Sequence, residues 1–337
     1  MTSDAANIRE ALQQAGSHFL ALVEIGILKT FVDFRVFDAI PNDGDISFSE
    51  LGSKTGAQPA LLERFSTFLI ASDILLSPRP GYVAHTARSR PYQAGGVSAG
   101  FVVHVFNFFL RPMACWPAYF SEVGLREPPN SRKIPLGLGL GHPGLDMYGI
   151  LDAEPALAAL FNQAQARSAG IFSLQSLYSL QWVEGLLDQS EPRLAFCAVF
   201  DLPKTVDAAR AQLDGKLGQA KLVGGTMFEP LPQEIRGALV YQFRRVLSDF
   251  PDNEIIAALS NVRQACGTDT RVLIIEELLR PNRSKFAIAQ DIAVFNFGGK
   301  RRSEAMFREL TAAAGFHVSG AFHPEDSEFG VLELVRR

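Results

Sequence analysis

Residues 238–252 have the sequence ALVYQFRRVLSDFPD, an apolar run that gives way to charged and polar side chains. The run predicts a buried strand over 238–243, and a helix is expected to follow over 252–266. The next apolar run predicts a strand over 272–276, which ends in the carboxylates Glu276 and Glu277. Strands and helices that alternate in this way are typical of a largely parallel sheet covered by helices on both faces.

The same alternation continues on both sides of this stretch. Further strands are expected over 196–200, 220–223, 316–322 and 330–335, and further helices over 207–217 and 303–314. A short loop joins the last two strands, which predicts an antiparallel edge. Residues 191–337 are therefore predicted to form one α/β domain.

The N-terminal residues predict a different, smaller domain over 1–96. A helical pattern over 7–40 is followed by a turn, by helices that start near Ser47 or Ser49 and at Pro59, and by a hairpin over 75–86. Helix, turn, helix and hairpin make a winged-helix layout, which can bind DNA or mediate dimerisation. The second helix carries only Glu63 and Arg64 among apolar residues, and a DNA-reading helix needs several basic and amide side chains. We therefore expect a dimerisation domain.

Composition limits the other possibilities. The 337 residues suit two domains, and a net charge of −4 disfavours nucleic-acid binding. The three cysteines indicate neither a disulfide framework nor a metal cluster. The first residues lack a basic and apolar leader, and no apolar run reaches the ~18–20 residues of a membrane span, so we expect a cytoplasmic protein without a membrane partner. The 26 phenylalanines suit a pocket for a hydrophobic small molecule as well as filled cores.

A mostly helical segment over 97–190 is expected between the two domains, interrupted by a loop over 127–144. This loop contains the glycine-rich sequence GLGLGH at 137–142. A dinucleotide-binding loop follows a strand and opens a helix, whereas here Pro135 precedes the glycines and Pro143 follows them. The segment is therefore interpreted as a surface or lid loop.

Several motifs, taken in order, resemble the class I O-methyltransferases of secondary metabolism. They are FDLP at 200–203, GG and FEPLP at 224–225 and 228–232, RVLSDFPD at 245–252, DIAVFNFGGKRRS at 291–303, and the final strand hairpin. The resemblance implies an α/β fold with an N-terminal winged-helix dimerisation domain, a Rossmann-like methyltransferase domain and a homodimer. It also implies S-adenosylmethionine as the methyl donor of the family.

The family's cofactor loop, D-x-G-G-G-x-G, has no counterpart here. It should lie between Trp182 and Asp201, which are only 19 positions apart (201 − 182). A βαβ unit needs about 30 residues. We therefore expect a shortened or rearranged sheet that lacks a central strand and whose neighbouring strands close the gap. A wrongly joined gene would leave the same gap.

The family's proton-abstracting machinery is also replaced. Ser248 stands at the position of the catalytic histidine of L-H-D-W, Arg301 at the glutamate that orients this histidine, and Thr226 at an acidic loop position. A serine hydroxyl is no base at neutral pH without a partner. The departures favour an enzyme that does not methylate and uses no cofactor, with S-adenosylmethionine as the cofactor if methylation persists.

The candidate catalytic residues are His104, Glu277, Ser248 and Asp249. Glu277 is an acid or base or else a solvated carboxylate, and His104 is a proton-handling group or else a core residue. Asp201 binds the cofactor ribose, as in the family, or simply caps the following helix, and Asp252 is expected to cap the helix over 252–266. The candidate walls of the substrate pocket, which could equally be core, are Asn107, Met113, Trp116, Phe120, Met147, Phe161, Phe295 and Asn296.

Three functions remain open. The first is a non-methylating enzyme of secondary metabolism that cyclises, dehydrates or rearranges a hydrophobic polyketide-like or aromatic molecule. The second is an O-methyltransferase with a remodelled cofactor site. The third is a non-catalytic partner that dimerises with an active homologue.

Overall fold

The structure is a computed structural model that describes all residues except 1, 170–176, 180, 183–196, 214–219 and 325–326. The chain divides into two compact units. Unit 1 comprises residues 1–111 and 151–169, and unit 2 comprises residues 112–150 and 170–337. The helical residues between the predicted domains are thus shared between the units. The predicted boundaries 1–96, 97–190 and 191–337 stay a prediction.

Unit 1 contains the expected winged helix. Its three short strands pair antiparallel in the order β1-β3-β2. Ser47 caps α3 through its hydroxyl, and Pro59 is the first residue of α4, as the sequence predicts. The elements are α1 (Thr2–Asp33), α2 (Val36–Ala39), β1 (Ile46–Ser47), α3 (Phe48–Thr55), α4 (Pro59–Ala71), β2 (Leu75–Leu76), β3 (Tyr82–His85), η1 (Arg90–Tyr92), α5 (Val97–Val105), the π-helical turn η2 (Phe106–Leu110) and α10 (Pro155–Ala169).

The helix predicted over 7–40 is divided in two. Arg35 has a left-handed backbone (φ 55°), which ends α1 and starts α2. On both sides of this break the apolar faces of α1 to α4 meet in one core. It includes the buried residues Ile27, Phe31, Phe37 and Leu69. The burial of these side chains stabilises the unit at roughly 25 cal/mol per Å² of apolar surface.

Unit 2 is built on the C-terminal strands. Its first helices are α6 (Arg111–Ala114), α7 (Trp116–Val123), α8 (Pro135–Leu140) and α9 (Met147–Ala153), of which α6 begins and α9 ends at the boundary with unit 1. The remaining elements are β4 (Cys197–Asp201), α12 (Pro203–Leu213), β5 (Ala220–Gly224), η4 (Gln233–Ile235), β6 (Val240–Arg244), η5 (Leu247–Asp249), α13 (Asp252–Ala265), β7 (Arg271–Glu277), α14 (Lys285–Val294), η6 (Phe295–Phe297), α15 (Glu304–Ala313), β8 (Phe316–Phe322) and β9 (Phe329–Arg336).

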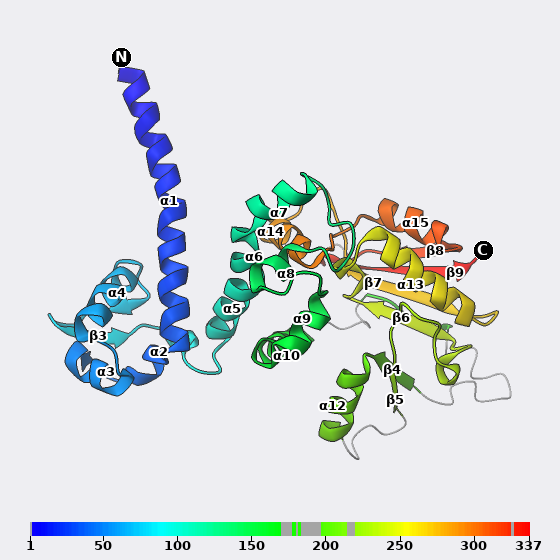
Figure 1. Ribbon diagram of the computed structural model, residues 1–337, viewed down its shortest axis with the longest axis horizontal. Helices are drawn as coiled ribbons and strands as arrows, with labels where there is room; N and C mark the ends of the chain where they lie inside the picture. Colours follow the sequence, from blue (N-terminus) through cyan, green and yellow to red (C-terminus); the bar gives the residue numbers. More distant parts are fainter. Residues whose placement is uncertain (1, 170–176, 180, 183–196, 214–219, 325–326) are drawn as a thin grey trace. The chain divides into compact units, whose positions relative to one another are not determined.

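The strands of unit 2 form two sheets among the described residues (Figure 1). β4 and β5 pair in parallel, and a separate sheet has the order β6-β7-β9-β8. β6 and β7 are parallel, whereas β9 is antiparallel to both of its neighbours, as the predicted edge requires. Within the described residues the expected shortened or rearranged sheet is confirmed. The expectation that the neighbouring strands close the gap is wrong for the described residues, because β4 and β6 do not pair there.

The first four residues of the glycine-rich segment at 137–142 are helical, so its interpretation as part of a loop is wrong for these residues. Pro135 is the first residue of α8, where the missing N–H of proline does no harm. Gly141 ends the helix with a left-handed backbone (φ 82°), and the His142 N–H donates to the Gly137 carbonyl. Three glycines in six residues therefore make one helical turn and its C-cap.

Two helices meet the length and hydropathy expected of a membrane span, Ile8–Asp33 and Val97–Ala114. The expectation that no segment does so is wrong by this criterion. Core helices of soluble proteins meet it as well, so the observation is weak evidence for a membrane.

Candidate functional site

Three of the predicted catalytic residues lie together at the carboxyl ends of two adjacent parallel strands. Ser248 and Asp249 lie in η5, shortly after β6, and Glu277 is the last residue of β7. The register pairs Arg244 with Ile275, so both strands end at the same edge of the sheet. Ligands of open parallel sheets bind at this edge.

Glu276, which the sequence interpretation passed over in favour of Glu277, anchors the cluster. Residues 272 to 275 of β7 are fully buried, and strand alternation directs Glu276 to the same face as Val272 and Ile274. Its side chain has no solvent exposure. A buried carboxylate needs hydrogen bonds, so the end of a buried strand was a signal that could have found it.

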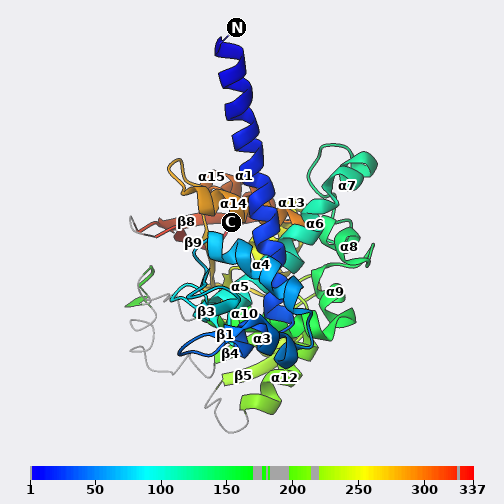
Figure 2. The same cartoon turned by 90° about the vertical axis from the view of Figure 1, so that its left-hand side faces the viewer.

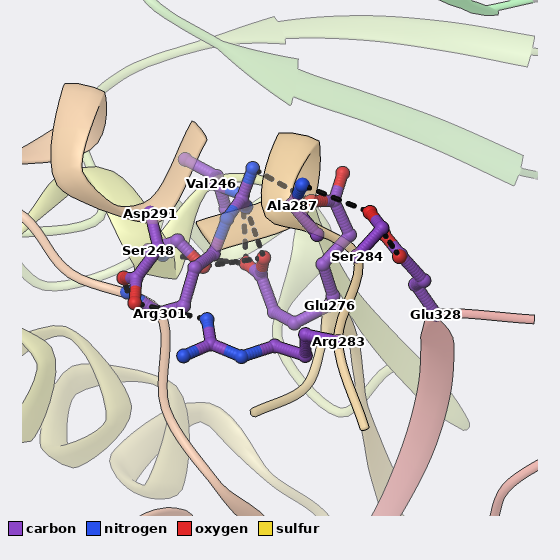
Figure 3. A network of polar contacts seen from close by, with 10 residues as sticks. Val246, Ser248, Glu276, Arg283, Ser284, Ala287, Asp291, Arg301 and Glu328 are labelled. Carbon is purple, nitrogen blue, oxygen red and sulfur yellow. Dashed lines mark hydrogen bonds and ion pairs between the residues drawn. The ribbon is translucent and has the colours of Figure 1, made fainter. Parts of the chain in front are cut away.

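Glu276 receives its hydrogen bonds from the turn that follows β6 (Figure 3). Its Oε1 accepts from the backbone N–H groups of Val246 (3.0 Å), Leu247 (2.9 Å) and Ser248 (3.4 Å). The Ser248 hydroxyl donates to Oε2 at 2.7 Å. Ser248 thus fixes a carboxylate and a turn. Burial raises the pKa of Glu276, and these hydrogen bonds and the Arg301 charge oppose the rise.

Arg301 links the two glutamates. Its Nη2 lies 2.9 Å from Glu277 and its Nη1 lies 4.0 Å from Glu276. The backbone N–H of Arg301 donates to Asp291 at 2.8 Å, and Arg283 pairs with the same aspartate at 3.0 Å (Figure 3). Where the family resemblance places a glutamate, the chain therefore places a cation that balances two carboxylates.

Asp249 is the titratable group of this cluster best suited to proton transfer. Its pKa is raised from 3.8 to about 7, chiefly by burial and also by the charge of Glu276, while the charges of Arg301 and Arg245 oppose the rise. The residue as a whole nevertheless keeps some solvent exposure. A carboxyl group whose pKa is near neutral can both accept and donate a proton.

Tyr148 adds a hydroxyl that the sequence interpretation missed, although it named the neighbouring Met147. Burial raises the pKa of Tyr148, and the charges of Asp249 and Asp201 raise it further. The phenol is therefore a neutral hydrogen-bond donor close to two of the predicted site residues.

Arg302 ties the turn to the loop before α15. The fully buried guanidinium donates to the carbonyl groups of Leu247, Phe250 and Lys300, and to Asp252. Asp252 also pairs with Lys300 at 2.9 Å. The expected capping role of Asp252 is wrong, because it is the first residue of α13 and its carboxylate binds these two cations.

A cavity of about 280 Å³ is lined in part by Asp252, Lys300 and Arg302. None of the predicted catalytic, cofactor-binding or pocket residues lines it. Its lining residues are Glu127, Pro128, Pro251, Asp252, Asn253, Gly298, Lys300 and Arg302.

The predicted pocket residues of unit 2 form an aromatic cluster between α7 and η6. Trp116 donates from its indole N–H to the Asn296 amide oxygen at 2.8 Å. The rings of Phe120 and Phe295 stack at 5.4 Å, and Trp116 meets Phe295 edge-on at 5.6 Å. Asn296 and Met147 are buried, and Met113 is half-buried. Their role as pocket walls stays a prediction.

His104, Asn107 and Phe161 belong to unit 1 and form a group of their own. The ring of Phe108 lies 4.8 Å from His104 and 5.7 Å from Phe161. Burial lowers the pKa of His104, and its Nδ1 is buried without a hydrogen-bond partner. Asn107 donates to the Val103 carbonyl within the same helical stretch. Whether these residues act on a substrate stays a prediction.

The residues described beside Asp201 do not fit S-adenosylmethionine. Asp201 is exposed and accepts a hydrogen bond from the N–H of the next residue, Leu202, at 2.7 Å. A Cβ on Gly225 would lie 2.6 Å from the Phe200 ring, so this glycine serves packing. The described part of the chain offers no glycine-rich turn next to β4, and it contains no group of His, Cys, Asp and Glu that could hold a metal ion.

The winged helix, the parallel strands and the cluster at their carboxyl ends together define a methyltransferase-type fold with its own polar site. The family comparisons agree. The O-methyltransferase domain matches residues 191–317, and the O-methyltransferase dimerisation domain matches residues 17–97. The chain belongs to the O-methyltransferase family.

Among characterised relatives, the methyltransferase phm5 of a Pyrenochaetopsis species is 48% identical over 359 positions that cover 98% of both chains. The methyltransferase pynC of Aspergillus niger is 35% identical, over an alignment that covers 95% of this chain and 96% of pynC. Since 359 positions exceed the 337 residues of this chain, at least 22 positions of the first alignment (359 − 337) lack a residue here.

Solved structures share the fold. OxaC in complex with sinefungin and meleagrin has a TM-score of 0.83 and 21% identity, over 97% of this chain and 88% of its own. LepI in complex with SAM has a TM-score of 0.77 and 16% identity, over 98% of this chain and 94% of its own. Because these neighbours were solved with S-adenosylmethionine or sinefungin, the comparisons do not support the expectation that no cofactor is used.

Proposed function

We propose that the chain is an enzyme of secondary metabolism that acts on a small hydrophobic molecule by proton transfer without transferring a methyl group. The observation that carries this proposal is Asp249, whose pKa is raised to about 7. It lies next to Ser248, which is tied to the buried Glu276. A carboxyl group with this pKa is about half ionised at neutral pH, which suits a group that first removes and then returns a proton.

The chemistry balances with the groups of this site. Ionised Asp249 takes a proton from an acidic C–H or O–H bond of the substrate, and the electron pair of that bond forms a new double bond while a neighbouring π bond or C–O bond breaks. Where a π bond breaks, protonated Asp249 returns the proton to the atom that receives the electron pair of that bond. Where a C–O bond breaks, its electron pair stays on the departing hydroxyl group, which takes the proton from Asp249 and leaves as water. The phenol of Tyr148, which is kept neutral, is placed to donate a hydrogen bond to an oxygen that gains negative charge.

The proposed substrate class rests on an aromatic cluster in the same unit. The aromatic residues Trp116, Phe120 and Phe295 pack together in the same unit, and such surfaces suit a flat, apolar ligand. We expect a polyketide-like or aromatic intermediate that undergoes cyclisation, dehydration or a pericyclic rearrangement in a biosynthetic pathway. A shaped apolar pocket accelerates such reactions by holding a near-attack conformation.

Methyl transfer is the second candidate, and the names of the relatives favour it. A relative named a methyltransferase is 48% identical across 98% of both chains. Against it stand the serine at the family's base position and the poor fit of the described residues around Asp201 to the cofactor. If methyl transfer persists, S-adenosylmethionine supplies the methyl group.

The remaining properties are proposals of the same kind. The dimerisation domain supports a homodimer. The chain is proposed to be cytoplasmic and to use no metal ion, nucleic acid or membrane.

The test uses extracts of a strain from which the gene has been deleted. Purified full-length chain is incubated with the accumulated intermediates in D2O, with and without S-adenosylmethionine, and products are followed by mass spectrometry. The proposal expects an intermediate to be consumed without the cofactor and without gain of a methyl group. A product of isomerisation should gain deuterium, whereas a product of dehydration should be lighter by one water. The Asp249→Asn variant should lose at least about 100-fold in rate, on the usual size of acid–base contributions. The exposed Asp269→Asn serves as the control.

Two results would overturn the proposal. A product that forms only with S-adenosylmethionine and is heavier by a methyl group supports the second candidate. Absence of turnover until a homologous chain is added supports a non-catalytic dimer partner.

A further inference from the structure

The cavity lined by Asp252, Lys300 and Arg302 takes no part in the proposed proton transfer. It forms where three segments of unit 2 meet, namely the residues that follow α7, the start of α13 and the loop before α15 (Figures 1 and 2). Its volume of about 280 Å³ lies below the roughly 300–1,000 Å³ of pockets that hold drug-sized ligands, so the cavity suits a smaller molecule.

The inner wall and the mouth of the cavity differ in polarity. The lining residues Pro128, Pro251 and Gly298 are buried, whereas Glu127 and Asn253 are exposed. Lining residues that are exposed lie where the cavity meets the solvent. A ligand therefore enters past polar side chains and meets an uncharged wall behind them.

One carboxylate of the cavity faces two cations. Asp252 accepts from Lys300 at 2.9 Å and from Arg302 at 2.8 and 2.6 Å. Burial opposes the ionisation of Asp252, but the hydrogen bonds from both cations hold its pKa below the ordinary value. The nitrogens of Arg302 are all in use, whereas the Lys300 ammonium group donates one hydrogen bond among the described residues and has two donors left. Lys300 can therefore bind an anionic group of a ligand.

Glu127 supplies the opposite charge at the mouth of the cavity. It forms no ion pair in the described part of the chain, whereas the nearby Glu122 pairs with Lys133 at 2.8 Å. Asn253 adds an amide that can donate a hydrogen bond to a carboxylate or accept one from an ammonium group. A cation with donors left and a carboxylate without a cation are complementary to a ligand that carries both charges.

Arg302 connects the cavity to the turn that carries Ser248 and Asp249. Its guanidinium group donates to the carbonyl groups of Leu247 at 3.3 Å and Phe250 at 2.8 Å, one on each side of these two residues. The same side chain lines the cavity. A ligand that orders the cavity therefore also restrains this turn.

We propose that the cavity is an effector site for a small zwitterion, an α-amino acid, whose carboxylate group pairs with Lys300 and whose ammonium group pairs with Glu127. Because Arg302 belongs to the cavity wall and holds the turn over 247–250, the bound amino acid stabilises the turn that carries Asp249. The inference goes beyond the proposed function and does not depend on it, since it concerns a second site and not the proton transfer.

Calorimetric titration of the purified full chain tests the binding. The probes are single L-amino acids and, for the one that binds best, the matching acid without the amino group and the matching amine without the carboxyl group. The best amino acid should bind with a Kd of about 1 mM or lower, and each matched probe at least about 10-fold more weakly. No binding by any amino acid, or equally tight binding of either matched probe, would overturn the proposal.

Substitutions at the two charged ends locate the ligand on the chain. Glu127→Gln and Lys300→Gln should each weaken the binding of the amino acid at least about 10-fold, because each removes one charge-assisted hydrogen bond. The control is Glu122→Gln, which removes an exposed carboxylate outside the cavity and should bind like wild type. Glu127 is exposed, so its variant stays informative even if Lys300→Gln unfolds. Unchanged binding in Glu127→Gln would contradict the proposal.

Hydrogen–deuterium exchange tests the link to the turn. At a ligand concentration of about ten times the Kd, the amides of residues 247–250 should exchange about 10-fold more slowly, because opening of the turn then requires release of the amino acid. The amides of α4 in unit 1 are the control and should exchange as before. Full binding without any change at 247–250, or equal slowing in α4, would overturn the link through Arg302.

Discussion

The Ser248 hydroxyl donates a 2.7 Å hydrogen bond to Oε2 of Glu276, a carboxylate without solvent exposure. Ser248 lies in the turn after β6, and Glu276 lies near the end of the neighbouring strand β7. The hydrogen bond therefore links this turn to the end of β7. The serine at the family's base position therefore has a structural partner here, and we propose the next residue, Asp249, as the proton-transfer group.

Removal of the Glu276 carboxylate should destabilise the chain strongly. Glu276→Ala leaves three backbone N–H groups and the Ser248 hydroxyl without their acceptor and removes one of the two carboxylates near Arg301, which we expect to cost about 3–5 kcal/mol. Ser248→Ala removes one hydrogen bond and should cost about 1 kcal/mol. Urea unfolding measures both values, with the exposed Glu309→Ala as a control expected within about 0.5 kcal/mol of wild type. Equal losses for the first two variants would contradict the anchoring role of Glu276.

The stability of the chain should depend on Asp249 between about pH 4 and pH 7. The pKa of this carboxyl is raised in the folded state, so the folded chain holds a proton that the unfolded chain has released. Stability is therefore lost as pH rises through this window. Asp249→Asn removes the loss, and because the residue is partly exposed we expect a gain of about 2 kcal/mol at pH 8 and little change at pH 4. Thermal unfolding across this pH range is the measurement. A variant less stable than wild type at pH 8 would show that the carboxylate is held ionised.

Gly299 should tolerate no side chain. A Cβ at this position would lie 1.9 Å from the Ser248 carbonyl oxygen and 2.7 Å from the Asp249 backbone. Gly299→Ala must displace the turn and should cost about 2–4 kcal/mol. Gly267→Ala, whose Cβ would meet its nearest atom, the Thr270 hydroxyl oxygen, at 3.6 Å, is the control. Similar melting temperatures for the two variants would mean that the turn yields easily.

Arg302 should not be replaceable by lysine. All of its guanidinium nitrogens donate to carbonyl groups or to Asp252, and an ammonium group cannot reach these acceptors together. Arg302→Lys should lose about 3 kcal/mol of unfolding free energy. The same change at Arg308, which is half exposed and pairs with Glu304, should lose less than about 1 kcal/mol. If the two variants unfold at the same urea concentration, the network around Arg302 contributes little.

The strands and most helices could be predicted because their apolar periodicity is local. The alternation around β6 and β7 located the sheet edge, and with it Ser248, Asp249 and Glu277. The α8 helix was missed because three glycines argue against a helix, whereas the terminal signals of Pro135 and Gly141 decide in its favour.

Contacts between distant segments could not be predicted. Arg302 and Asp252 are 50 positions apart, and nothing in the spacing of either residue indicates that they pair. Glu276 and Glu277 are adjacent and chemically alike, so only the burial of β7 shows which of them anchors the turn. His104 and Asp249 were grouped by their chemistry, yet they belong to different units.

The division of the strands into two sheets implies that unit 2 can open locally at β4 and β5 before the whole unit unfolds. Within the described residues β4 hydrogen-bonds only to β5, whereas β7 is bonded on both sides and its apolar residues are fully buried. Opening of β4, β5 and α12 would break few backbone bonds to the rest of unit 2. Amide hydrogens of β4 should therefore exchange with deuterium through local opening, while those of β7 exchange only when the whole unit unfolds.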